Sequence, residues 1–482
     1  MTQMTTEAAL DPALRAEFER ILGSDGVVTA PSEIACAQVD VWWITRYEFS
    51  RGGPLPRCQA LVFPRTTAEV ASIVRLCGEQ GVAVVARGGG AGDSGGSVPV
   101  RGGIVVDTKR MDRILELNER SLTVRVQPGV LQVHLEEWLN RRGLTMNHFP
   151  ASINTSTVGG FISTNGTGVL SSKYGKMTDM VHQLEVVLPT GAVFRSLPVN
   201  HHSCGPDLTK LFIGAEGTLG IVTEALLKVH PLPETRAFVC LAFADLAHGI
   251  EAGRKVMVAG LYPSVMRLYD ESDAEHILKK QYGIEDRGCF FMAGFDGPTR
   301  VVDAQIAIAR ELFVEGGGRE LDDRHALVWW NDRLKSYYPP LDYVCEPWMT
   351  AVTDTVAPYE SIEGVYAAMK SAVEDGFREH GALFHAHFSH WYDWGTSFYP
   401  TFLVKQVPAE RDDALDLYGS LIDACGRAAI DNGAALNEHH GIGMRFGHLM
   451  KEAYGEESFR LLEAIKGAVD PNGVMNPGKL GL

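Results

Sequence analysis

The glycine-rich segment 86–96, ARGGGAGDSGG, constrains the fold of this 482-residue chain more than any other stretch. It follows the apolar run 81–85, GVAVV, which predicts a buried strand. Six of its eleven residues lack a Cβ, which indicates that another group approaches this backbone closely. Because successive N–H groups without side chains can bind phosphate, the segment predicts a phosphate-binding loop.

The spacing of Gly90, Gly92 and Gly95 matches the GxGxxG pattern of dinucleotide-binding folds, but its context excludes that fold. The Rossmann fingerprint requires its last glycine at the start of a helix. Here the segment runs through SVPVRG into another predicted strand at 102–108. The tail segment GVMNPGK is excluded as a nucleotide P-loop, because Leu480 stands where that motif needs Ser or Thr.

Two further glycine-rich segments, 150–168 and 205–225, lie beside predicted strands. The first, PASINTSTVGGFISTNGTG, combines glycines with small and hydroxyl side chains. The second, GPDLTKLFIGAEGTLGIVTEA, contains a strand signal at 221–223. Tight turns explain any one such segment equally well. Three of them between residues 86 and 225 favour a single extended ligand that crosses several loops.

Hydrophobic periodicity predicts a mixture of helices and strands along the whole chain. Thr66 and Glu69 form a capping-box pattern that predicts the start of a helix. Beyond residue 232 the character changes, and strands such as 237–244 alternate with helices. The other predicted elements are strands at 60–63 and 121–129 and helices at 11–23, 130–143, 304–312 and 458–469.

The composition limits the partners of the chain. The formal net charge is −16 and the isoelectric point is about 5.5, which excludes a general affinity for nucleic acid or anionic membranes. The eight cysteines never form a CxxC pair, so we expect free thiols in a reducing compartment. The first residues lack a secretory signal, and no apolar run is long enough to span a membrane. We expect a cytoplasmic homodimer with a small-molecule substrate, no nucleic-acid partner and no membrane span.

Histidines gather in two short segments, 384–402 (FHAHFSHWYDWGTSFYPTF) and 436–445 (LNEHHGIGMR). The histidines concerned are His385, His387, His390, His439 and His440. Helix ends or core hydrogen bonds explain any single one of them, but the pair of segments favours a chemical site. A metal bound through the nitrogen atoms of three of these rings is one alternative.

All these segments together resemble the FAD-binding (PCMH-type) fold of the vanillyl-alcohol oxidase superfamily. The resemblance is nearest to the branch of D-lactate and glycolate dehydrogenases and alkyldihydroxyacetonephosphate synthase. It covers residues 55–232 almost continuously and resumes at 433–482. The stretches that carry it are FPRTTAEV, ARGGGAGDSGG, GGIVVDTKRM, PASINTSTVGGFISTNGTG, SSKYGKMTDMV, LPTGAVFR, GPDLTKLFIGAEGTLGIVTEA and DPNGVMNPGKLGL.

The resemblance implies a fold class and a domain order. The implied class is α+β, with a two-lobed FAD-binding domain of the vanillyl-alcohol oxidase type and an α+β cap domain over the flavin ring. The implied order is an N-terminal helical segment 1–54, the FAD-binding domain 55–232, a substrate or cap domain 233–432 and a C-terminal segment 433–482 that returns to the FAD domain.

The resemblance also assigns the three glycine segments to FAD. The first would wrap the pyrophosphate, the second would pass the ring and ribityl chain, and the third would approach the adenine half. Where many relatives carry a histidine for covalent attachment this chain has Ala91, and the stretch 157–168 has no cysteine, so non-covalent FAD is expected. The implied cofactor-binding residues are Arg87, Gly88, Gly89, Gly90, Ala91, Gly92, Asp93, Ser94, Pro150, Thr157, Gly159, Gly160, Ser163, Thr164, Gly168, Tyr174, Glu216, Gly217, Gly220, Ile221 and Asn476.

The histidine segments depart from the pattern of metal-using relatives. Those relatives are similar in carrying two histidines seven residues apart and a glutamate directly before the final His-Gly. Here Trp394 stands seven residues after His387, and His439 precedes His440. No metal is therefore expected.

The same segments are similar to the synthase branch, which has a His-x-x-His pair, a tyrosine in an aromatic strand and a histidine triplet before glycine. The pair corresponds to His387 and His390, and the tyrosine to Tyr399. The triplet reads Glu438-His439-His440. Glu438 departs from the branch pattern, which argues against the synthase activity itself.

We predict an FAD-dependent oxidase or dehydrogenase that oxidises a hydroxyl-bearing carbon, in a 2-hydroxy acid or another alcohol, by hydride transfer to flavin N5. A histidine suits removal of the hydroxyl proton near neutral pH, and His440 is the predicted base, with His439 and Tyr399 orienting the substrate. Arg267 stands where relatives place a cap arginine, and it is predicted to pair with a carboxylate or phosphate. Arg333 is a second candidate for that role, although a surface ion pair explains either arginine equally well.

Two alternatives stay open at this stage. One is a synthase-like exchange of an acyl for an alkoxy group on a dihydroxyacetone phosphate derivative, with no net redox change. The other is a flavin-bearing binding or sensor protein, and the two histidine segments count against it.

Overall fold

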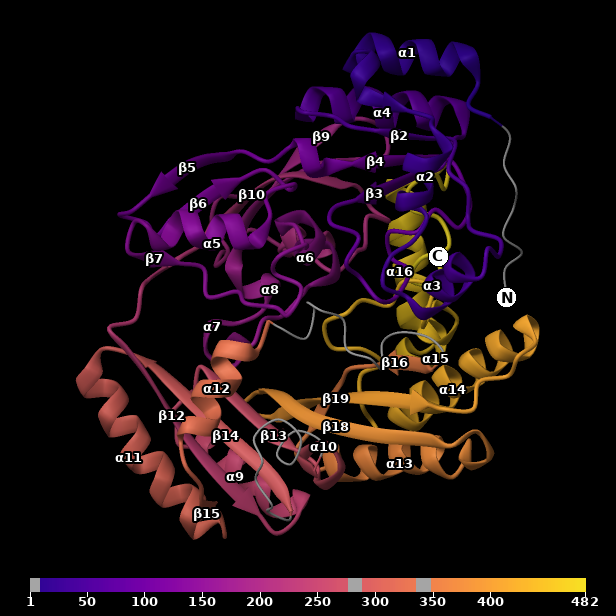
Figure 1. The fold of residues 1–482 in the computed structure, drawn as a ribbon. Helices are drawn as coiled ribbons and strands as arrows, with labels where there is room; N and C mark the ends of the chain where they lie inside the picture. Colours follow the sequence, from indigo (N-terminus) through magenta and orange to yellow (C-terminus); the bar gives the residue numbers. More distant parts are fainter. Residues whose placement is uncertain (1–8, 276–287, 335–347) are drawn as a thin grey trace.

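The computed structural model describes residues 9–275, 288–334 and 348–482 (Figure 1). Its secondary structure forms three main sheets with helices packed against them. Two sheets form a pair of lobes in the upper half of Figure 1, and the largest sheet forms the cap in the lower half. This is the α+β fold that the sequence predicts.

The first lobe is a four-stranded sheet in the order β1-β2-β4-β3. Strands β2 and β3 are both parallel to β4, and the glycine segment after β3 leads into β4 with no helix between them. The capping box is confirmed, because Thr66 Oγ1 accepts the N–H of Glu69 at 3.2 Å. The elements are β1 (Val27–Val28), β2 (Ala60–Val62), β3 (Val84–Arg87), β4 (Ile104–Asp107), α1 (Pro12–Leu22), α2 (Pro31–Ala37), α3 (Trp43–Ser50) and α4 (Thr67–Gln80).

The second lobe is an antiparallel five-stranded sheet in the order β5-β6-β10-β8-β9. Leu135 and Leu139 of α5 and Phe161 of α6 pack into its core. The short pair β7 and β11 joins this lobe to the cap. The elements are β5 (Ile114–Asn118), β6 (Thr123–Val126), β7 (Leu144–Thr145), β8 (Val181–Val187), β9 (Val193–Arg195), β10 (Ile221–Lys228), β11 (His230–Pro231), α5 (Gln132–Asn140), α6 (Val158–Thr164), α7 (Ser171–Tyr174) and α8 (Met177–Met180).

The cap is an antiparallel sheet in the order β15-β12-β14-β13-β18-β19-β16, with β17 also paired to β19. Helices α9, α11 and α13 cover its lower face in Figure 1, while α7 and α12 lie on the side of the lobes. The elements are β12 (Thr235–Phe243), β13 (Val265–Tyr269), β14 (Cys289–Gly297), β15 (Arg319–Glu320), β16 (Met349–Val352), β17 (Thr355–Pro358), β18 (Ala382–Trp391), β19 (Gly395–Val404), α9 (Leu246–Val258), α10 (Glu271–Ala274), α11 (Thr299–Glu315), α12 (Arg324–Asp332) and α13 (Ile362–Glu374).

The C-terminal part of the chain runs from the cap back to the first lobe. It contains α14 (Arg411–Asp431), α15 (Met450–Tyr454) and α16 (Glu456–Val469). After α16, the N–H of Val84 on β3 donates to Val474 O at 2.7 Å, and the N–H of Asn476 donates to Val84 O at 2.8 Å. The tail therefore extends the first sheet next to the strand that carries the glycine segment.

The hydrophobic core of the cap continues into both ends of the chain. Trp43 of α3 stacks on Tyr418 of α14 with ring centroids 4.9 Å apart. Leu436 and Phe446 pack in the same core, although both follow the predicted boundary at 432. The boundaries at 54, 232 and 432 stay predictions.

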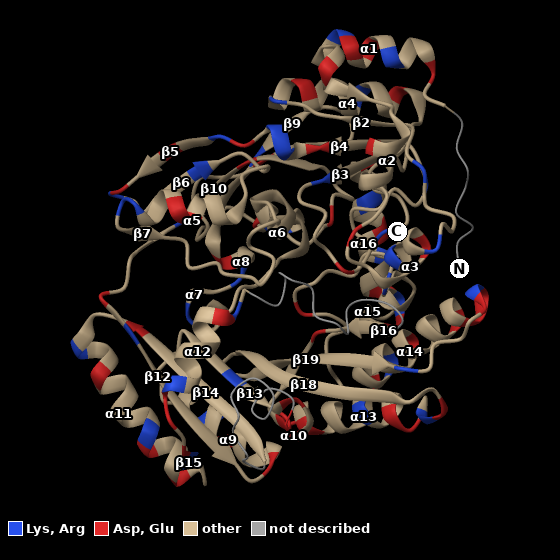
Figure 2. Ribbon diagram, viewed as in Figure 1, with Lys and Arg blue, Asp and Glu red and all other residues tan. Residues whose placement is uncertain are grey.

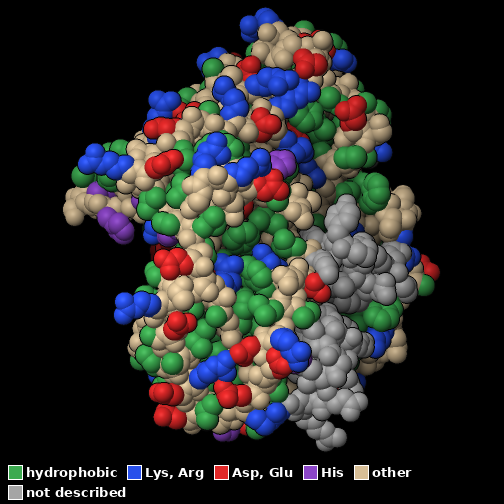
Figure 3. Space-filling model, turned by 60° about the vertical axis from the view of Figure 1, so that its left-hand side comes forward, with side chains coloured by type: hydrophobic (Ala, Val, Ile, Leu, Met, Phe, Trp, Pro, Cys, Tyr) green, Lys and Arg blue, Asp and Glu red, His purple; other side chains and the backbone are tan. Residues whose placement is uncertain are grey.

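Charged residues lie mainly on the outer helices, and β18 and β19 carry none (Figure 2). On the face shown in Figure 3, basic and acidic side chains are interspersed, and hydrophobic side chains gather between the upper and lower halves. Among the helices that the structure describes, none has both the length and the apolar character that crossing a membrane requires. The seven cysteines within the described ranges are free thiols, and Cys345 lies outside those ranges.

Gly253 sets how closely α9 approaches the cap sheet, and its replacement gives a first prediction. A Cβ at this position would lie 2.4 Å from the buried Trp391 ring, so we expect Gly253→Ala to lower the free energy of unfolding by about 1–3 kcal/mol. Gly419 of α14 is the matched control, because no described atom beyond its chain neighbours and its own helix backbone lies within 4 Å of its Cβ position. Gly419→Ala should raise the same quantity by up to about 1 kcal/mol. Denaturant unfolding measures both, and equal effects would contradict the packing argument.

Candidate functional site

One face of the cap sheet gathers three of the predicted site residues. Arg267 lies on β13, His387 on β18 and Tyr399 on β19. His387 is in register with Tyr399 on one neighbour and with Tyr269 on the other. The rings of His387 and Tyr399 are stacked, with centroids 5.1 Å apart. Because alternate residues of a strand share a face, Arg267 lies on the same face of the sheet as Tyr269. This face packs against the lobes, where Tyr269 lies in one cluster with Leu170.

His387 is a neutral imidazole beside a carboxylate. Its Nδ1 lies 3.3 Å from Oδ2 of Asp273 on α10. Burial and the charge of Arg267 hold the pKa of His387 well below its usual value, so the ring is neutral at pH 7. When Nδ1–H donates to Asp273, Nε2 carries the lone pair and can accept a proton.

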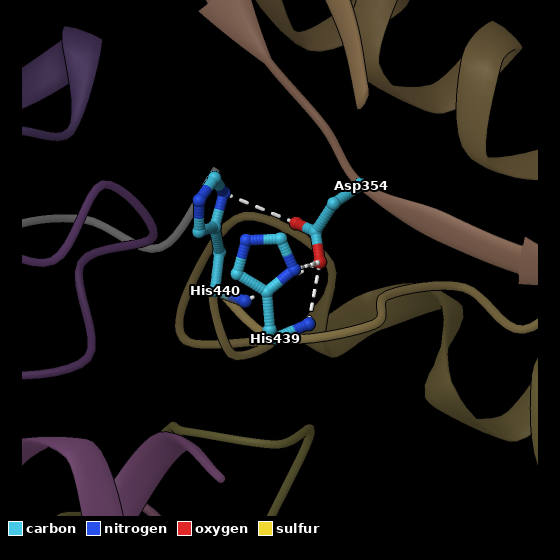
Figure 4. Close-up of side chains that lie close together, drawn as sticks. All are labelled: Asp354, His439 and His440. Atoms are coloured by element: carbon cyan, nitrogen blue, oxygen red, sulfur yellow. Dashed lines mark hydrogen bonds and ion pairs between the residues drawn. The ribbon is translucent and has the colours of Figure 1, made fainter. Parts of the chain in front are cut away.

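Asp354 fixes the histidine loop, which we define as residues 437–445. Its Oδ2 accepts the N–H of Glu438 at 2.8 Å, and its two oxygens lie 3.0 and 3.1 Å from Nδ1 of His439 and His440 (Figure 4). Burial opposes ionisation of Asp354, but the two histidines outweigh it and hold its pKa well below the usual value. The buried aspartate is therefore an anion that the loop surrounds.

Glu438 is a second buried anion, on the other side of His439. Its Oε1 accepts hydrogen bonds from Lys176 Nζ at 2.8 Å and Tyr392 Oη at 2.7 Å. Its Oε2 lies 3.2 Å from Nδ1 of His390 and also contacts Nδ1 of His439. Burial would raise the pKa of Glu438, but His390 and His439 hold it well below the usual value. Burial also lowers the pKa of His390, which is therefore neutral.

Two groups of one acid and two histidines are compact. Within each group, the histidine nitrogen and carboxylate oxygen atoms lie within 4.8 Å of one another. One group contains Asp354 and the other contains Glu438, and His439 belongs to both. Each carboxylate already accepts N–H or O–H groups from its surroundings. The close spacing is thus accounted for by the acid–histidine pairs themselves.

The charge of His440 does not fit the role of base that the sequence predicts for it. Its Nδ1 lies 3.3 Å from Asp93 Oδ2 and 3.1 Å from Asp354 Oδ1. Burial alone would lower the pKa of His440, but the two carboxylates raise it to about 10. The ring therefore holds its proton at neutral pH and acts as a cation rather than as a proton acceptor.

The first glycine segment is shaped partly by the protein itself. A Cβ at Gly88 would lie 2.2 Å from Thr157 Oγ1, and one at Gly89 would lie 1.9 Å from Thr155 O. These two glycines allow the second segment to approach, which the sequence did not suggest. Gly92 differs, because apart from its chain neighbours no described atom lies within 4 Å of its Cβ position. Gly92 is exposed, so the first glycine segment is open to its surroundings at this residue.

The third glycine segment and the tail meet the histidine loop. The Glu216 carboxylate accepts the N–H groups of Ile442 at 2.6 Å and Gly443 at 2.9 Å, and burial raises its pKa to about 7. Asn476 Nδ2 donates to Gly96 O at 2.9 Å and to Glu216 O at 2.6 Å. Asn476 Oδ1 is buried and has no hydrogen-bond partner in the described part of the chain.

Three predicted cofactor residues have side chains engaged elsewhere. The Arg87 guanidinium donates to the carbonyls of Cys36 at 3.1 Å and Val39 at 2.8 Å. Tyr174 Oη donates to Asp296 Oδ1 on β14 at 2.7 Å, and the Ile221 side chain lies in the core of the first lobe. The remaining predicted positions belong to the converging loops and the neighbouring helix α6, namely Gly90, Ala91, Ser94, Pro150, Gly159, Gly160, Ser163, Thr164, Gly168, Gly217 and Gly220.

The two candidate arginines lie against aromatic rings of α12. The Arg267 guanidinium carbon is 5.0 Å from the centroid of Trp329, and that of Arg333 is 3.6 Å from the centroid of Trp330. Burial and the charge of Arg236 lower the pKa of Arg333 to about 10. Within the described residues neither guanidinium forms an ion pair, and the Nε atoms of both are buried without a hydrogen-bond partner. Among the described residues, neither arginine therefore forms the surface ion pair that was the alternative.

Five residues of the site were not chosen from the sequence. Lys176 and Arg445 belong to the stretches SSKYGKMTDMV and LNEHHGIGMR, which the sequence singled out, but their contacts in the site were not predicted. Asp273 and Asp354 meet their histidines across more than 80 residues of chain, and no spacing signals such pairs. His148 is fully buried, and neither ring nitrogen has a partner among the described residues. Burial, His390 and His439 lower its pKa to about 3.

Comparison with known families covers both halves of the chain. The family model described as "FAD binding domain" matches residues 58–196. The model described as "FAD linked oxidases, C-terminal domain" matches residues 232–480.

Named relatives fall into more than one activity class. An alkyldihydroxyacetonephosphate synthase of Trypanosoma brucei brucei is 28% identical over 470 residues, covering 92% of this chain and 75% of the relative. The glycolate oxidase subunit GlcD of Bacillus subtilis (strain 168) is 28% identical over 431 residues, covering 87% and 88%.

Solved structures share the fold at lower identity. An alkyldihydroxyacetonephosphate synthase superposes with a TM-score of 0.82 at 22% identity, covering 99% of this chain and 88% of the other. A p-cresol methylhydroxylase with substrate bound superposes with a TM-score of 0.80 at 19% identity, covering 98% and 96%.

The ion pairs of Glu438 give a second prediction. Glu438→Gln removes the anion that pairs with Lys176 and leaves His439 with Asp354 alone, so we expect the free energy of unfolding at pH 7 to fall by about 2–4 kcal/mol. The folded-state pKa of Glu438 is depressed, so its contribution is present above the ordinary value of 4.5 and is lost as the pH falls. The difference in the free energy of unfolding between the native protein and Glu438→Gln should therefore become smaller below about pH 4.5.

Glu457→Gln is the control for this variant, because the Glu457 side chain is 80% exposed in its ion pair. Its effect should stay within about 0.5 kcal/mol. A Glu438→Gln protein as stable at pH 7 as the control would contradict the proposed charge balance.

Proposed function

We propose that this chain, which belongs to the FAD linked oxidase family, oxidises a hydroxyl-bearing carbon of a small anionic substrate such as a 2-hydroxy acid. The observation that carries the proposal is the Asp273–His387 pair beside Arg267 on one face of the cap sheet. A neutral base and a cation without a carboxylate partner in the described chain are the two groups that a hydroxy acid requires.

The converging loops fit the FAD that the family binds. Gly92 leaves room beside the first glycine segment, and the Asn476 Oδ1 acceptor is buried without a partner in the described structure. Residues of the three glycine segments and Asn476 would hold the cofactor. When bound, FAD supplies the acceptor for the hydrogen and electron pair removed from the substrate carbon. The FAD is proposed to be non-covalent, since Ala91 replaces the attachment histidine.

The proton of the substrate hydroxyl would pass to Nε2 of His387. Asp273 then stabilises the imidazolium that forms, as a carboxylate on Nδ1 does in other acid–base pairs. Burial keeps the ring neutral beforehand, so it is ready to accept the proton at pH 7. This assignment replaces His440, which already carries a proton.

The substrate anion would be held by the cations around His387. Arg267 lies on the same sheet face, and His440 carries its charge next to Tyr399, with ring centroids 5.1 Å apart. Asp354 also raises the pKa of His439 against the effect of burial, which favours a positive charge there as well. Charge-assisted hydrogen bonds from these groups would orient the substrate carbon.

A second candidate is the synthase-like exchange of an acyl for an alkoxy group. The Trypanosoma relative and the pairing of His387 with Tyr399 support it. Glu438 counts against it, because the residue is a buried anion that binds Lys176 and two histidines. The exchange would leave the flavin oxidised at the end of each turnover, whereas alcohol oxidation would leave it reduced without an acceptor.

Anaerobic addition of D-2-hydroxy acids tests the function directly. Loss of the oxidised-flavin absorption band is expected if the proposal holds. His387→Gln should lower the rate of this loss by about 10²–10⁴-fold, because glutamine cannot accept the proton. His385→Gln, on the same strand with its Nδ1 bonded to Ser272 Oγ at 2.7 Å, is the control and should reduce at the normal rate. Flavin that stays oxidised with every alcohol tested would sink the proposal and favour the exchange.

Gly92→Val tests the location of the cofactor. The Cβ position is open, so the protein without FAD should keep its stability to within about 0.5 kcal/mol. The added side chain would occupy space that the pyrophosphate needs, so the dissociation constant of FAD should rise at least about tenfold, which is 1.4 kcal/mol. Gly467→Ala on α16 is the control. Flavin fluorescence measures binding, and unchanged affinity in Gly92→Val would move the pyrophosphate elsewhere.

A further inference from the structure

We propose that Asp93, inside the first glycine segment, is the positioning residue that holds His440 in the substrate site as a cation. The loop assigned to the cofactor would thereby also set a charge that faces the substrate. The proposal rests on the proposed function for the identity of that site, but the contacts that carry it do not depend on the substrate.

The contacts join two segments from opposite ends of the chain. Asp93 Oδ2 accepts a hydrogen bond from Arg445 Nη1 at 3.0 Å and lies 3.3 Å from His440 Nδ1. The side chains of Asp93 and Arg445 are 17% and 1% exposed. One carboxylate oxygen therefore serves two cationic groups of the histidine loop in a largely buried setting.

Backbone contacts keep Asp93 from moving independently of that loop. Ser94 O accepts the N–H groups of Met444 at 2.8 Å and Arg445 at 3.2 Å. A Cβ at Gly443, whose φ is +51°, would lie 2.2 Å from Ser94 O, so the two backbones are in close contact. The position of the Asp93 carboxylate is thus fixed relative to His440.

The surroundings of His440 explain why Asp93 matters more than its distance alone suggests. Asp354 Oδ1 also lies 3.1 Å from His440 Nδ1, but the Asp354 carboxylate pairs with His439 as well and accepts three backbone N–H groups. The centroid of the His439 ring is 4.3 Å from that of the His440 ring, and the centroid of Tyr399 is 5.1 Å away. Because Asp354 lies beside both His439 and His440, Asp93 is the second carboxylate that balances the charge of His440.

The sign of the effect follows from the charges. Burial favours a neutral His440, while Asp93 and Asp354 favour its protonated form and raise its pKa to about 10. Removal of the Asp93 charge leaves the Arg445 cation nearby, and this cation opposes protonation of His440. His440 should then lose its proton at a lower pH than in the native protein.

The test follows His440 itself in the FAD-loaded protein without substrate. Histidine labelled with ¹³C at Cε1 gives one NMR signal per ring, and the His440 signal is identified by its loss in His440→Gln. In the native protein this signal should stay that of a charged ring up to about pH 9, given the pKa of about 10. In Asp93→Asn the proton affinity should fall at least tenfold, which is one pKa unit.

Asp107→Asn is the matched control, since Asp107 is a buried acid of the same lobe that pairs with Lys109. Its His440 signal should titrate as in the native protein. An unchanged titration in Asp93→Asn would overturn the proposal, as would FAD affinity that falls tenfold while the His440 titration is unchanged. If Asp93→Asn does not fold, Arg445→Met provides a second test. Loss of Arg445 leaves the Asp93 carboxylate to His440 alone, so the pKa of His440 must rise.

These outcomes are separate from those of the proposed function. The titration needs no turnover, so a protein that reduces no flavin with any alcohol can still show the link between Asp93 and His440. A protein that oxidises hydroxy acids while Asp93→Asn leaves His440 unchanged would retain the function and lose this proposal.

Discussion

A buried carboxylate has to be matched by nearby donors, and four such carboxylates determine where the histidine loop lies. Asp93 comes from the first glycine segment, Glu216 from the third, Asp354 from the cap and Glu438 from the loop itself. Each accepts N–H groups or pairs with cations of residues 437–445 or of their neighbours. The loop is thus held between both lobes and the cap.

The same arrangement divides the histidines into two charge states within a small volume. Neighbouring carboxylates raise the pKa of His439 and of His440, and His440 is a cation. Burial lowers the pKa of His387 and of His390, which stay neutral. Groups whose environments push their pKa values apart can take different parts in one reaction. Cations can hold an anionic substrate at the same time as a neutral ring accepts its proton.

Local signals in the sequence predicted local structure well. The Thr66–Glu69 capping box and the strands on either side of the first glycine segment follow from a few neighbouring residues. The reason for Gly88 and Gly89 did not, because the atoms that exclude a Cβ belong to Thr155 and Thr157, far along the chain.

The charge of His440 could not be predicted from the sequence, for the same physical reason. A histidine is neutral or charged according to its neighbours, and Asp93 and Asp354 become its neighbours only in the folded chain. Residue type and spacing therefore indicated a candidate site, and the fold sets the electrostatic surroundings of each ring in it.

The pairing of residues 474–476 with β3 has a consequence for how the protein is made. The outer edge of the strand that leads into the first glycine segment is completed by residues 474–476, which are synthesised after both lobes. Asn476 also closes the contact between the first and third glycine segments. A ribosome-bound chain can form much of each lobe, but the glycine segments of the two lobes lack the connection through Asn476 until residue 476 has been synthesised.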